Sequence, residues 1–216
     1  MKSLAMNLNP ESIVYNADCM DIMKGSPDKY FDLSVVDPPY GIGASEMTMG
    51  SGKNKKYTKG KKWDNKTPDK QYFEEIIRIS KNQIIWGGNY FELPKTKSWI
   101  LWDKGIYGDC DFADGELAWT SFNIVLRIAK IRYKGFLGAD DVRIHPTQKP
   151  VKLYDWIFKN YAKPTDKILD THLGSGSSRI AAYKSGLSFV GIELDKDYFE
   201  AQEKRFNTFK SQLRLF

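Results

Sequence analysis

Short apolar runs alternate along the chain with amphipathic stretches, a pattern typical of a parallel sheet with helices on both faces. Runs rich in Val, Ile and Trp predict strands at residues 12–16, 31–37, 83–87, 98–103, 167–170 and 188–193. Two further β-rich runs, ELAWTSF and IVLRIAKIRY, lie close together between residues 116 and 133 and predict an antiparallel hairpin. We therefore expect an α/β fold with a mostly parallel, twisted sheet and one antiparallel hairpin.

Helix signals fall between the predicted strands. Thr67 followed by Pro68 predicts a capped helix start, and Pro150 opens a second helix. A third helix is expected over residues 176–185, and a fourth begins at Asp195. No repeat or linker interrupts this order, so the 216 residues predict a single domain.

One segment, residues 41–66, lacks hydrophobic periodicity and is rich in Gly, Lys, Ser and Asn. A loop of this length inside a compact domain is usually functional or disordered, and we expect a mobile loop here. Seven lysines between residues 53 and 66, against the single acid Asp64, account for the whole net charge of +6. Such a local positive field favours a polyanion such as nucleic acid, although a plain solvated loop has the same composition.

Basic residues elsewhere extend this prediction to the second run of the expected hairpin. The candidate nucleic-acid contacts are Lys53, Lys55, Lys56, Lys59, Lys61 and Lys62 in the loop, and Arg127, Lys130, Arg132 and Lys134 in the hairpin.

The remaining composition narrows the class of protein. No apolar run approaches the roughly 18 residues that a membrane span needs. The amino-terminal stretch lacks the apolar block of a secretory signal, so we expect a cytoplasmic protein. Cys19 and Cys110 make neither a disulfide framework nor a metal cluster, and no metal is expected. The composition is compatible with a monomer or a homodimer.

The strand predicted at residues 31–37 runs into Asp37-Pro38-Pro39-Tyr40. Two prolines cannot donate ladder hydrogen bonds, so the strand ends there, at the carboxyl edge where open α/β sheets bind ligands. The Asp37 carboxylate and the Pro38 carbonyl could hold both N–H bonds of a conjugated amino group, and Tyr40 could stack on a base. A strand-ending turn with a surface tyrosine is the alternative.

This tetrad resembles the catalytic tetrad of the amino-methyltransferases of DNA, whose adenine-specific members favour Asp at the first position. The resemblance implies a Rossmann-like, S-adenosylmethionine-dependent fold and methyl transfer to N6 of adenine in double-stranded DNA. It also implies catalytic roles for Asp37, Pro38, Pro39 and Tyr40, with Asp37 bordering the cofactor.

A second signal lies in KILDTHLGSGSSRIAAY, residues 167–183, where a short strand, a glycine turn and a helix follow one another. Gly174 and Gly176 let backbone amides approach a ligand at the helix amino terminus. Seventeen residues beyond Gly176, Glu193 ends the next strand, where its carboxylate could accept ribose hydroxyls. The dinucleotide phosphate fingerprint is missing, so the site suits a nucleoside cofactor without phosphates. A helix-capping role for Glu193 is the alternative.

The same stretch resembles the family's Asp-Pro-Phe-x-Gly-Ser-Gly-Thr cofactor motif. Thr171, His172 and Ser177 depart from that motif, and we expect His172 to act as a packing group. The resemblance implies contacts to S-adenosylmethionine from Asp170, Leu173, Gly174, Ser175, Gly176 and Glu193.

Two further elements complete the resemblance. Residues 143–150, RIHPTQKP, are similar to the family's His-Pro-Thr-Gln-Lys-Pro element, which implies that Thr147 and Lys149 contact the methionine carboxylate of the cofactor. Asp18 corresponds to the family's contact to the cofactor adenine. A proline-rich connector explains residues 143–150 otherwise, and a cap on a helix from Cys19 explains Asp18.

The tetrad precedes the glycine turn, an order that resembles the circularly permuted β-type members and, in length, the short phage-type adenine methyltransferases. Such a permutation is physically easy if the strand at 12–16 lies beside the strand at 188–193, which puts the two ends of the domain close together. Three alternatives remain open from the sequence: cytosine-N4 methylation, action on single-stranded DNA or RNA, and a catalytically silent methyltransferase-like subunit that binds nucleic acid.

Overall fold

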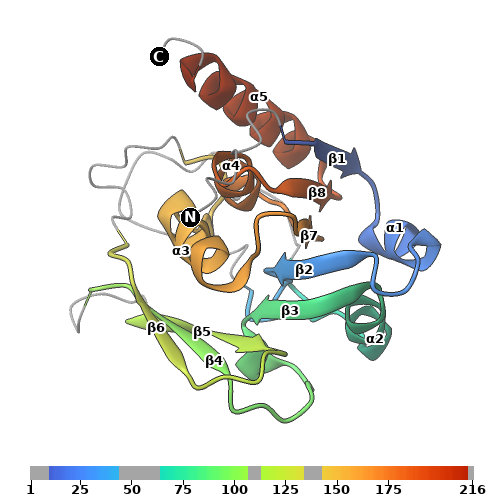
Figure 1. Cartoon of the computed structure of the whole chain (residues 1–216), viewed down its shortest axis with the longest axis vertical. Helices are drawn as coiled ribbons and strands as arrows, with labels where there is room; N and C mark the ends of the chain where they lie inside the picture. The colour runs from blue at the N-terminus through green and yellow to red at the C-terminus, as the bar shows by residue number, and fades with distance from the viewer. Residues whose placement is uncertain (1–9, 44–63, 107–112, 134–142, 214–216) are drawn as a thin grey trace, which may run out of the picture.

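The computed structural model describes residues 10–43, 64–106, 113–133 and 143–213 (Figure 1). The elements in chain order are β1 (Ser12–Asn16), α1 (Cys19–Gly25), β2 (Phe31–Val36), α2 (Lys70–Ile79), β3 (Ser80–Trp86), η1 (Gly88–Tyr90), β4 (Trp99–Asp103), β5 (Gly115–Thr120), β6 (Arg127–Lys130), α3 (Val151–Tyr161), β7 (Lys167–Asp170), α4 (Ser177–Lys184), β8 (Ser188–Glu193) and α5 (Lys196–Leu213). Within these ranges, the helices lack the combination of length and apolar character that crossing a membrane requires.

The strands form one sheet in the order β1-β8-β7-β2-β3-β5-β4-β6. The first five strands in this order, β1 to β3, pair in parallel with one another, and β5 runs antiparallel to both β3 and β4. The α/β fold with a mostly parallel sheet, predicted from the alternation of apolar runs and amphipathic stretches, is therefore confirmed.

Helices cover the two faces of this sheet, and each face has its own apolar core (Figure 1). Ile84 and Ile168 face the cluster that includes α3 and α4, whereas the next residues, Ile85 and Leu169, face the cluster that includes α1 and α2. Successive side chains of a strand point to opposite faces, so strands buried on both faces read as continuous apolar runs.

The hairpin predicted between residues 116 and 133 is wrong. Both runs form strands, β5 and β6, but β4 lies between them: β5 pairs with β4 in antiparallel fashion, and β6 pairs with the other side of β4 in parallel. The apolar β4, with Ile100 and Trp102 fully or almost fully buried, takes the interior position. The basic β6, which exposes Arg127 and Lys130, takes the edge, as charged strands commonly do.

The predicted helices are present, with one shifted start. Helix α2 begins at Lys70 rather than at Pro68, because the Asp69 carboxylate caps it by accepting from the Tyr72 amide at 3.1 Å. Helix α3 begins after Pro150, as predicted, and α4 begins after Gly176.

Strand β1 pairs in parallel with β8, with Asn16 opposite Glu193. This is the arrangement that makes the permuted order of motifs physically easy. The lysine-rich part of the 41–66 segment, with Lys53, Lys55, Lys56, Lys59, Lys61 and Lys62, lies outside the described residues, as does Lys134.

Truncation of Ile84 tests the central position of β3. Its side chain is fully buried between the neighbouring strands and the helix layer. We expect Ile84→Ala to lower the free energy of unfolding by about 2–5 kcal/mol, measured by urea denaturation. Val125→Ala, at a side chain that is 64% exposed, is the control and should change it by less than about 0.5 kcal/mol. Equal effects of the two variants would contradict the placement.

Candidate active site

Parallel pairing brings the predicted site residues to one edge of the sheet. Asp18 follows β1, Glu193 ends β8, Asp170 ends β7 and Asp37 follows β2, and these four strands are consecutive neighbours in the sheet. The proline turn and the glycine turn therefore start from adjacent strands, β2 and β7, at the same edge. This is the edge at which open α/β sheets bind ligands.

Both oxygens of the Asp37 carboxylate are engaged. The Tyr40 hydroxyl donates to Oδ1 at 2.6 Å, and the Lys149 ammonium donates to Oδ2 at 2.6 Å. Burial raises the pKa of the Asp37 carboxyl, and the charge of Lys149 opposes that rise. The structure thus joins the first and last residues of the tetrad to the His-Pro-Thr element through one carboxylate. Pro38 is buried and Pro39 half-buried.

Asp64, which is almost fully buried, binds the backbone at the end of the tetrad and just after it. Its Oδ1 accepts from the Tyr40 amide at 2.6 Å and from the Gly41 amide at 3.0 Å. In the sequence Asp64 is the only acid among seven lysines, and we counted it there only as a charge. Asp64 hydrogen-bonds to residues more than twenty positions away in the sequence, and no local pattern reveals such contacts.

The Tyr40 ring packs on backbone and on another aromatic ring. A side-chain carbon at Gly87 would lie 2.2 Å from that ring, so only glycine fits there, and its φ of +66° also favours glycine. The Tyr40 ring also stacks on the Tyr90 ring, with ring centroids 5.1 Å apart. Tyr90 is 48% exposed. An aromatic stack therefore leads from the tetrad to the surface.

Lys149 lies between two carboxylates. Besides Asp37 Oδ2, its ammonium is 3.1 Å from Glu116 Oε2, and Lys104 lies 2.8 Å from Glu116 Oε1. Burial alone would raise the pKa of Glu116, but the charges of Lys149 and Lys104 hold it below the usual value. For Lys149, burial would lower the pKa, and the charges of Asp37 and Glu116 raise it. The sequence predicted neither Glu116 nor Lys104. The signal that could have found them is a charged residue within β5 (Glu116) or directly after β4 (Lys104), because both strands are otherwise largely apolar.

The glycine turn is braced by buried carboxylates. Asp170 accepts from the His172 amide at 3.1 Å and from the Ser178 hydroxyl at 2.5 Å. Glu193 accepts from the Gly174 amide at 2.7 Å and from the Asp195 amide at 2.9 Å. These contacts fix the turn between β7 and α4 against the end of β8. Among the other predicted cofactor contacts, Leu173 and Ser175 are buried beside them, and Gly176 has a left-handed φ of +72°.

The His-Pro-Thr element lies against the glycine turn. A side-chain carbon at Gly174 would be 3.6 Å from the His145 ring, and that ring also packs against Tyr198, with centroids 4.4 Å apart. Thr147 contacts His145 Nδ1 through its hydroxyl at 3.2 Å. Residues 145–149 thus span the distance from the glycine turn to Asp37, which places the three predicted motifs side by side.

Two of the three residues that depart from the family's motif, Thr171 and His172, contact α2. The Tyr72 hydroxyl is 2.7 Å from the Thr171 hydroxyl, which lies 3.0 Å from His172 Nδ1. The His172 ring packs edge-on against the Tyr72 ring, and burial lowers the pKa of His172 to about 4. A neutral, packed imidazole agrees with the packing role expected for His172.

The outer predicted residues are also placed. Asp18 caps α1 by accepting from the Met20 amide at 2.8 Å, which is the structural role left open for it. Arg127, Lys130 and Arg132 are exposed on or just after the edge strand β6. They are not brought together with Asp37 and the glycine turn.

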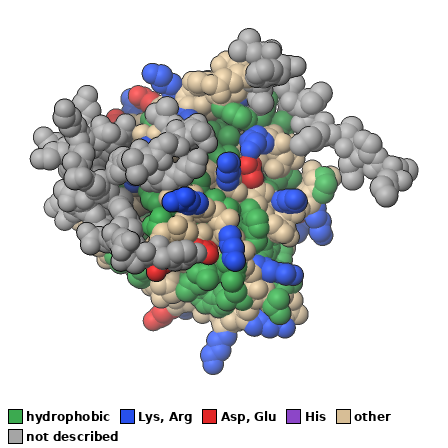
Figure 2. Space-filling model, turned by 90° about the vertical axis from the view of Figure 1, so that its left-hand side faces the viewer, with side chains coloured by type: hydrophobic (Ala, Val, Ile, Leu, Met, Phe, Trp, Pro, Cys, Tyr) green, Lys and Arg blue, Asp and Glu red, His purple; other side chains and the backbone are tan. Residues whose placement is uncertain are grey.

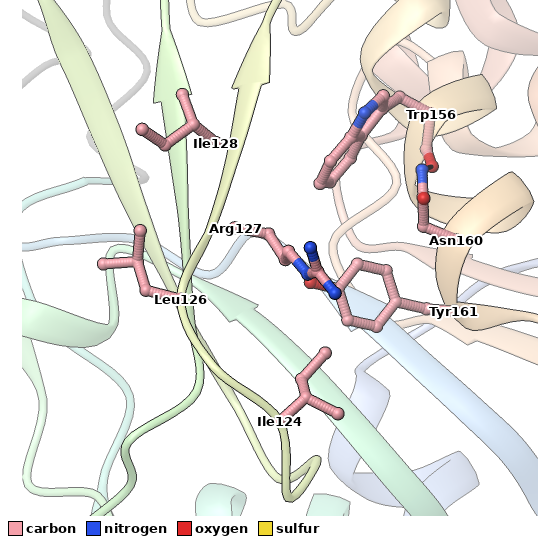
Figure 3. A pocket seen from close by; sticks show the side chains of 7 residues that line it. All are labelled: Ile124, Leu126, Arg127, Ile128, Trp156, Asn160 and Tyr161. Atoms are coloured by element: carbon pink, nitrogen blue, oxygen red, sulfur yellow. Dashed lines mark hydrogen bonds between the residues drawn. The ribbon is translucent and has the colours of Figure 1, made fainter.

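A groove of about 570 Å³ lies between β6 and α3 (Figure 3). Arg127 and Tyr161 point toward one another across it, and Trp156 and Ile128 also line it. Arg127 pairs with the first half of β4, opposite Ile100. The groove is therefore nearer the amino ends of the strands than the edge that carries Asp37.

The Asp170 carboxyl predicts a pH dependence of stability. Burial raises its pKa from its ordinary value to about 7, so between about pH 4 and pH 7 the folded chain binds a proton that the unfolded chain has released. Stability from this group is greatest below that interval and is lost as the pH rises to 7. Asp170→Asn removes this loss.

We expect urea denaturation to show Asp170→Asn gaining roughly 2–3 kcal/mol over the parent chain when the pH is raised from 5 to 8. Asp21→Asn, at an exposed position in the first turn of α1, is the matched control and should keep a constant difference from the parent chain. A constant difference for Asp170→Asn as well would show that Asp170 is already ionised at pH 5.

The sequence of this chain is similar to those of known proteins. M.HinfI, a type II methyltransferase of Haemophilus influenzae, is 23% identical, over 91% of this chain and 68% of that protein. YubD of Escherichia coli (strain K12) is 25% identical, over 87% of each chain.

Two solved structures share the fold. The complex of M1.HpyAVI with S-adenosylmethionine matches with a TM-score of 0.57 and 18% identity, covering 90% of this chain and 98% of that one. The cytosine-N4-specific PvuII DNA methyltransferase matches with a TM-score of 0.58 and 13% identity, covering 95% and 90%.

The DNA methylase family that comprises N6 and N4 methyltransferases matches residues 54–204. That match begins at residue 54, near the start of the lysine-rich segment, and extends through the His-Pro-Thr element and the glycine turn into α5. Since it covers well over half of the 216 residues, this chain is a member of the N6/N4 DNA methylase family.

Proposed function

We propose that the chain transfers a methyl group from S-adenosylmethionine to N6 of adenine in double-stranded DNA. The observation that carries the proposal is the position of Asp37 and Pro38 directly after β2, the strand next to the one that leads into the glycine turn, at one edge of the sheet. An acceptor pair for the nucleobase amino group and a nucleoside-binding turn are then neighbours. Catalysis needs positioning and electrostatics, without a covalent intermediate.

The acceptors near the glycine turn support a nucleoside cofactor without phosphates. Asp18, Asp170 and Glu193 lie at the ends of adjacent strands, where carboxylates suit hydroxyl donors and disfavour phosphates. Gly174 and Gly176 have positive φ, so the backbone there can approach a ligand as other residues cannot. We assign Asp170, Leu173, Gly174, Ser175, Gly176 and Glu193 to the adenosine side and Thr147 to the methionine side of the cofactor.

The chemistry requires an amino nitrogen with an available lone pair. Bound S-adenosylmethionine supplies an electrophilic methyl group: the N–C bond forms, the C–S bond breaks with its electron pair left on sulfur, and the nitrogen releases a proton. Asp37 and the Pro38 carbonyl hold the two N–H bonds of the target amine. Because burial raises the pKa of Asp37, this carboxylate is a suitable acceptor for the released proton.

Charge on one face supports a nucleic-acid substrate. The face that contains β6 and α3 shows many Lys and Arg side chains and few acids over its described surface (Figure 2). Arg127, Lys130 and Arg132 are exposed there and would contact phosphates, together with the lysines of the 53–66 segment. The target base must leave the duplex to reach Asp37, at a cost of roughly a few kcal/mol.

Cytosine-N4 methylation is the second candidate, because a structural neighbour, the PvuII enzyme, is cytosine-N4-specific. Both bases present an exocyclic amino group, so the tetrad could serve either. The aspartate at the head of the tetrad resembles the adenine-specific members and favours adenine.

The base is identified by digesting methylated DNA to nucleosides and analysing them by mass spectrometry. Incubation with S-adenosylmethionine and unmethylated duplex DNA should yield N6-methyladenine. N4-methylcytosine as the only product would replace the first candidate by the second. Parallel reactions with single-stranded DNA and with RNA test the substrate class.

Asp37→Ala tests the catalytic assignment. The variant removes the acceptor for the target amine, so the rate of methyl transfer should fall at least about 100-fold. Calorimetric titration should still show S-adenosylmethionine binding, because the glycine turn is held by other residues. Asp32→Ala, at the other end of β2 and in a surface ion pair with Lys81, is the matched control and should retain activity. Full activity of Asp37→Ala would defeat the assignment.

A further inference from the structure

The ammonium of Lys149 sits on the carboxylate that the proposed reaction needs. It donates to Asp37 Oδ2 at 2.6 Å and also contacts the Tyr40 hydroxyl at 3.3 Å, with only 5% of its side chain exposed. A cation in this position draws electron density from Asp37 and occupies one of its oxygens. Each carboxylate oxygen can accept two hydrogen bonds, so a nucleobase N–H can bond that oxygen beside Lys149, and a shift of Lys149 toward another anion would leave the oxygen a stronger acceptor for it.

Glu116 on β5 offers that anion. Its Oε2 is 3.1 Å from Lys149 Nζ, close enough for an ion pair. The same oxygen is buried and, among the described residues, accepts no hydrogen bond of acceptable geometry. Its partner oxygen, Oε1, is 2.8 Å from Lys104. A buried carboxylate oxygen that lacks a hydrogen bond is costly, so an arrangement in which Lys149 donates to it is favoured once Asp37 gains another donor.

We infer that Glu116 is a positioning residue, which receives the Lys149 ammonium when the target amino group binds Asp37. The inference rests on the proposed function, since it assigns a second acceptor to the same site. Lys149 then alternates between two carboxylates that are both already near it, at 2.6 Å (Asp37 Oδ2) and 3.1 Å (Glu116 Oε2) from its ammonium. Glu116 itself does not touch the nucleobase; Lys104 holds its far oxygen in place.

Three groups from different parts of the chain act on Asp37, and together they determine how a substitution at Glu116 changes its surroundings. Tyr40 and Lys149 bond the carboxylate directly, and the charge of Glu116 raises the pKa of Asp37. Replacement of Glu116 by a neutral side chain leaves Lys149 with Asp37 as its one remaining anionic partner among the described residues. The carboxylate then stays neutralised by Lys149 when the substrate arrives.

The test compares a neutral isostere with a shorter acid. Glu116→Gln keeps the shape and removes the charge, whereas Glu116→Asp keeps the charge and removes a methylene group. We expect single-turnover methyl transfer to duplex DNA to fall at least about tenfold in Glu116→Gln and to stay within about fivefold of the parent chain in Glu116→Asp. The dissociation constant for S-adenosylmethionine should change less than about twofold in both.

The order of the two variants distinguishes the roles. A residue needed only for packing would tolerate the isosteric Gln better than the smaller Asp, and that order would overturn the inference. Equal activity of Glu116→Gln and the parent chain would overturn it as well. Glu200→Gln, whose side chain on α5 is 64% exposed, is the control. Thermal melts establish folding; if Glu116→Gln does not fold, a rate for folded Glu116→Asp more than tenfold below the parent would overturn the inference.

Transfer is measured with a radiolabelled methyl group, which counts either base, and the nucleosides are identified separately. N4-methylcytosine as the product would defeat the adenine proposal and leave the Glu116 inference to the ratio of variant to parent, because both bases bring an amino group to Asp37. A parent chain that methylates neither base would overturn both.

Discussion

Parallel pairing of β7 with both β8 and β2 is the constraint on which the site depends. Because parallel strands end at the same edge, each strand can deliver one polar residue there, and the interior strands β2 and β7 keep most of their preceding residues buried. The chain uses this edge four times in adjacent strands, for Asp18, Glu193, Asp170 and Asp37. Helices on both faces hold the strands, and the proposed site residues lie at the strand ends or in the loops that follow them.

The buried charges near Asp37 are tolerated because they are paired. Two ammonium groups, of Lys149 and Lys104, alternate with two carboxylates, of Asp37 and Glu116, so the cluster is balanced in formal charge. An isolated buried ion would be strongly destabilising, and removal of one partner of a buried pair leaves the other uncompensated. The cluster is weak evidence for stability, but it ties β5, the tetrad and the His-Pro-Thr element together.

Much of the fold and of the site followed from local signals. The proline pair after a buried strand, the glycines before a helix and the order of motifs were enough to place Asp37 beside the glycine turn. The strand neighbours were harder: ELAWTSF and IVLRIAKIRY are close in sequence, yet β4 inserts between them because burial decides which strand takes the interior. Asp64 and Glu116 were missed since their partners, Tyr40 and Lys149, are far away in the sequence.

The departures at Thr171 and His172 bear on whether the glycine turn is still built as a binding site. Their side chains are joined to Tyr72 by short contacts, so α2 supports the turn from the face opposite α4. The turn keeps the features that depend on backbone: left-handed glycines at 174 and 176, and amides bonded to Asp170 and Glu193. Replacement of the motif's proline and phenylalanine has thus changed what the turn packs against, while Gly174 and Gly176 retain the left-handed backbone that lets a ligand approach closely. This argues for a chain that still binds its cofactor, against a silent subunit.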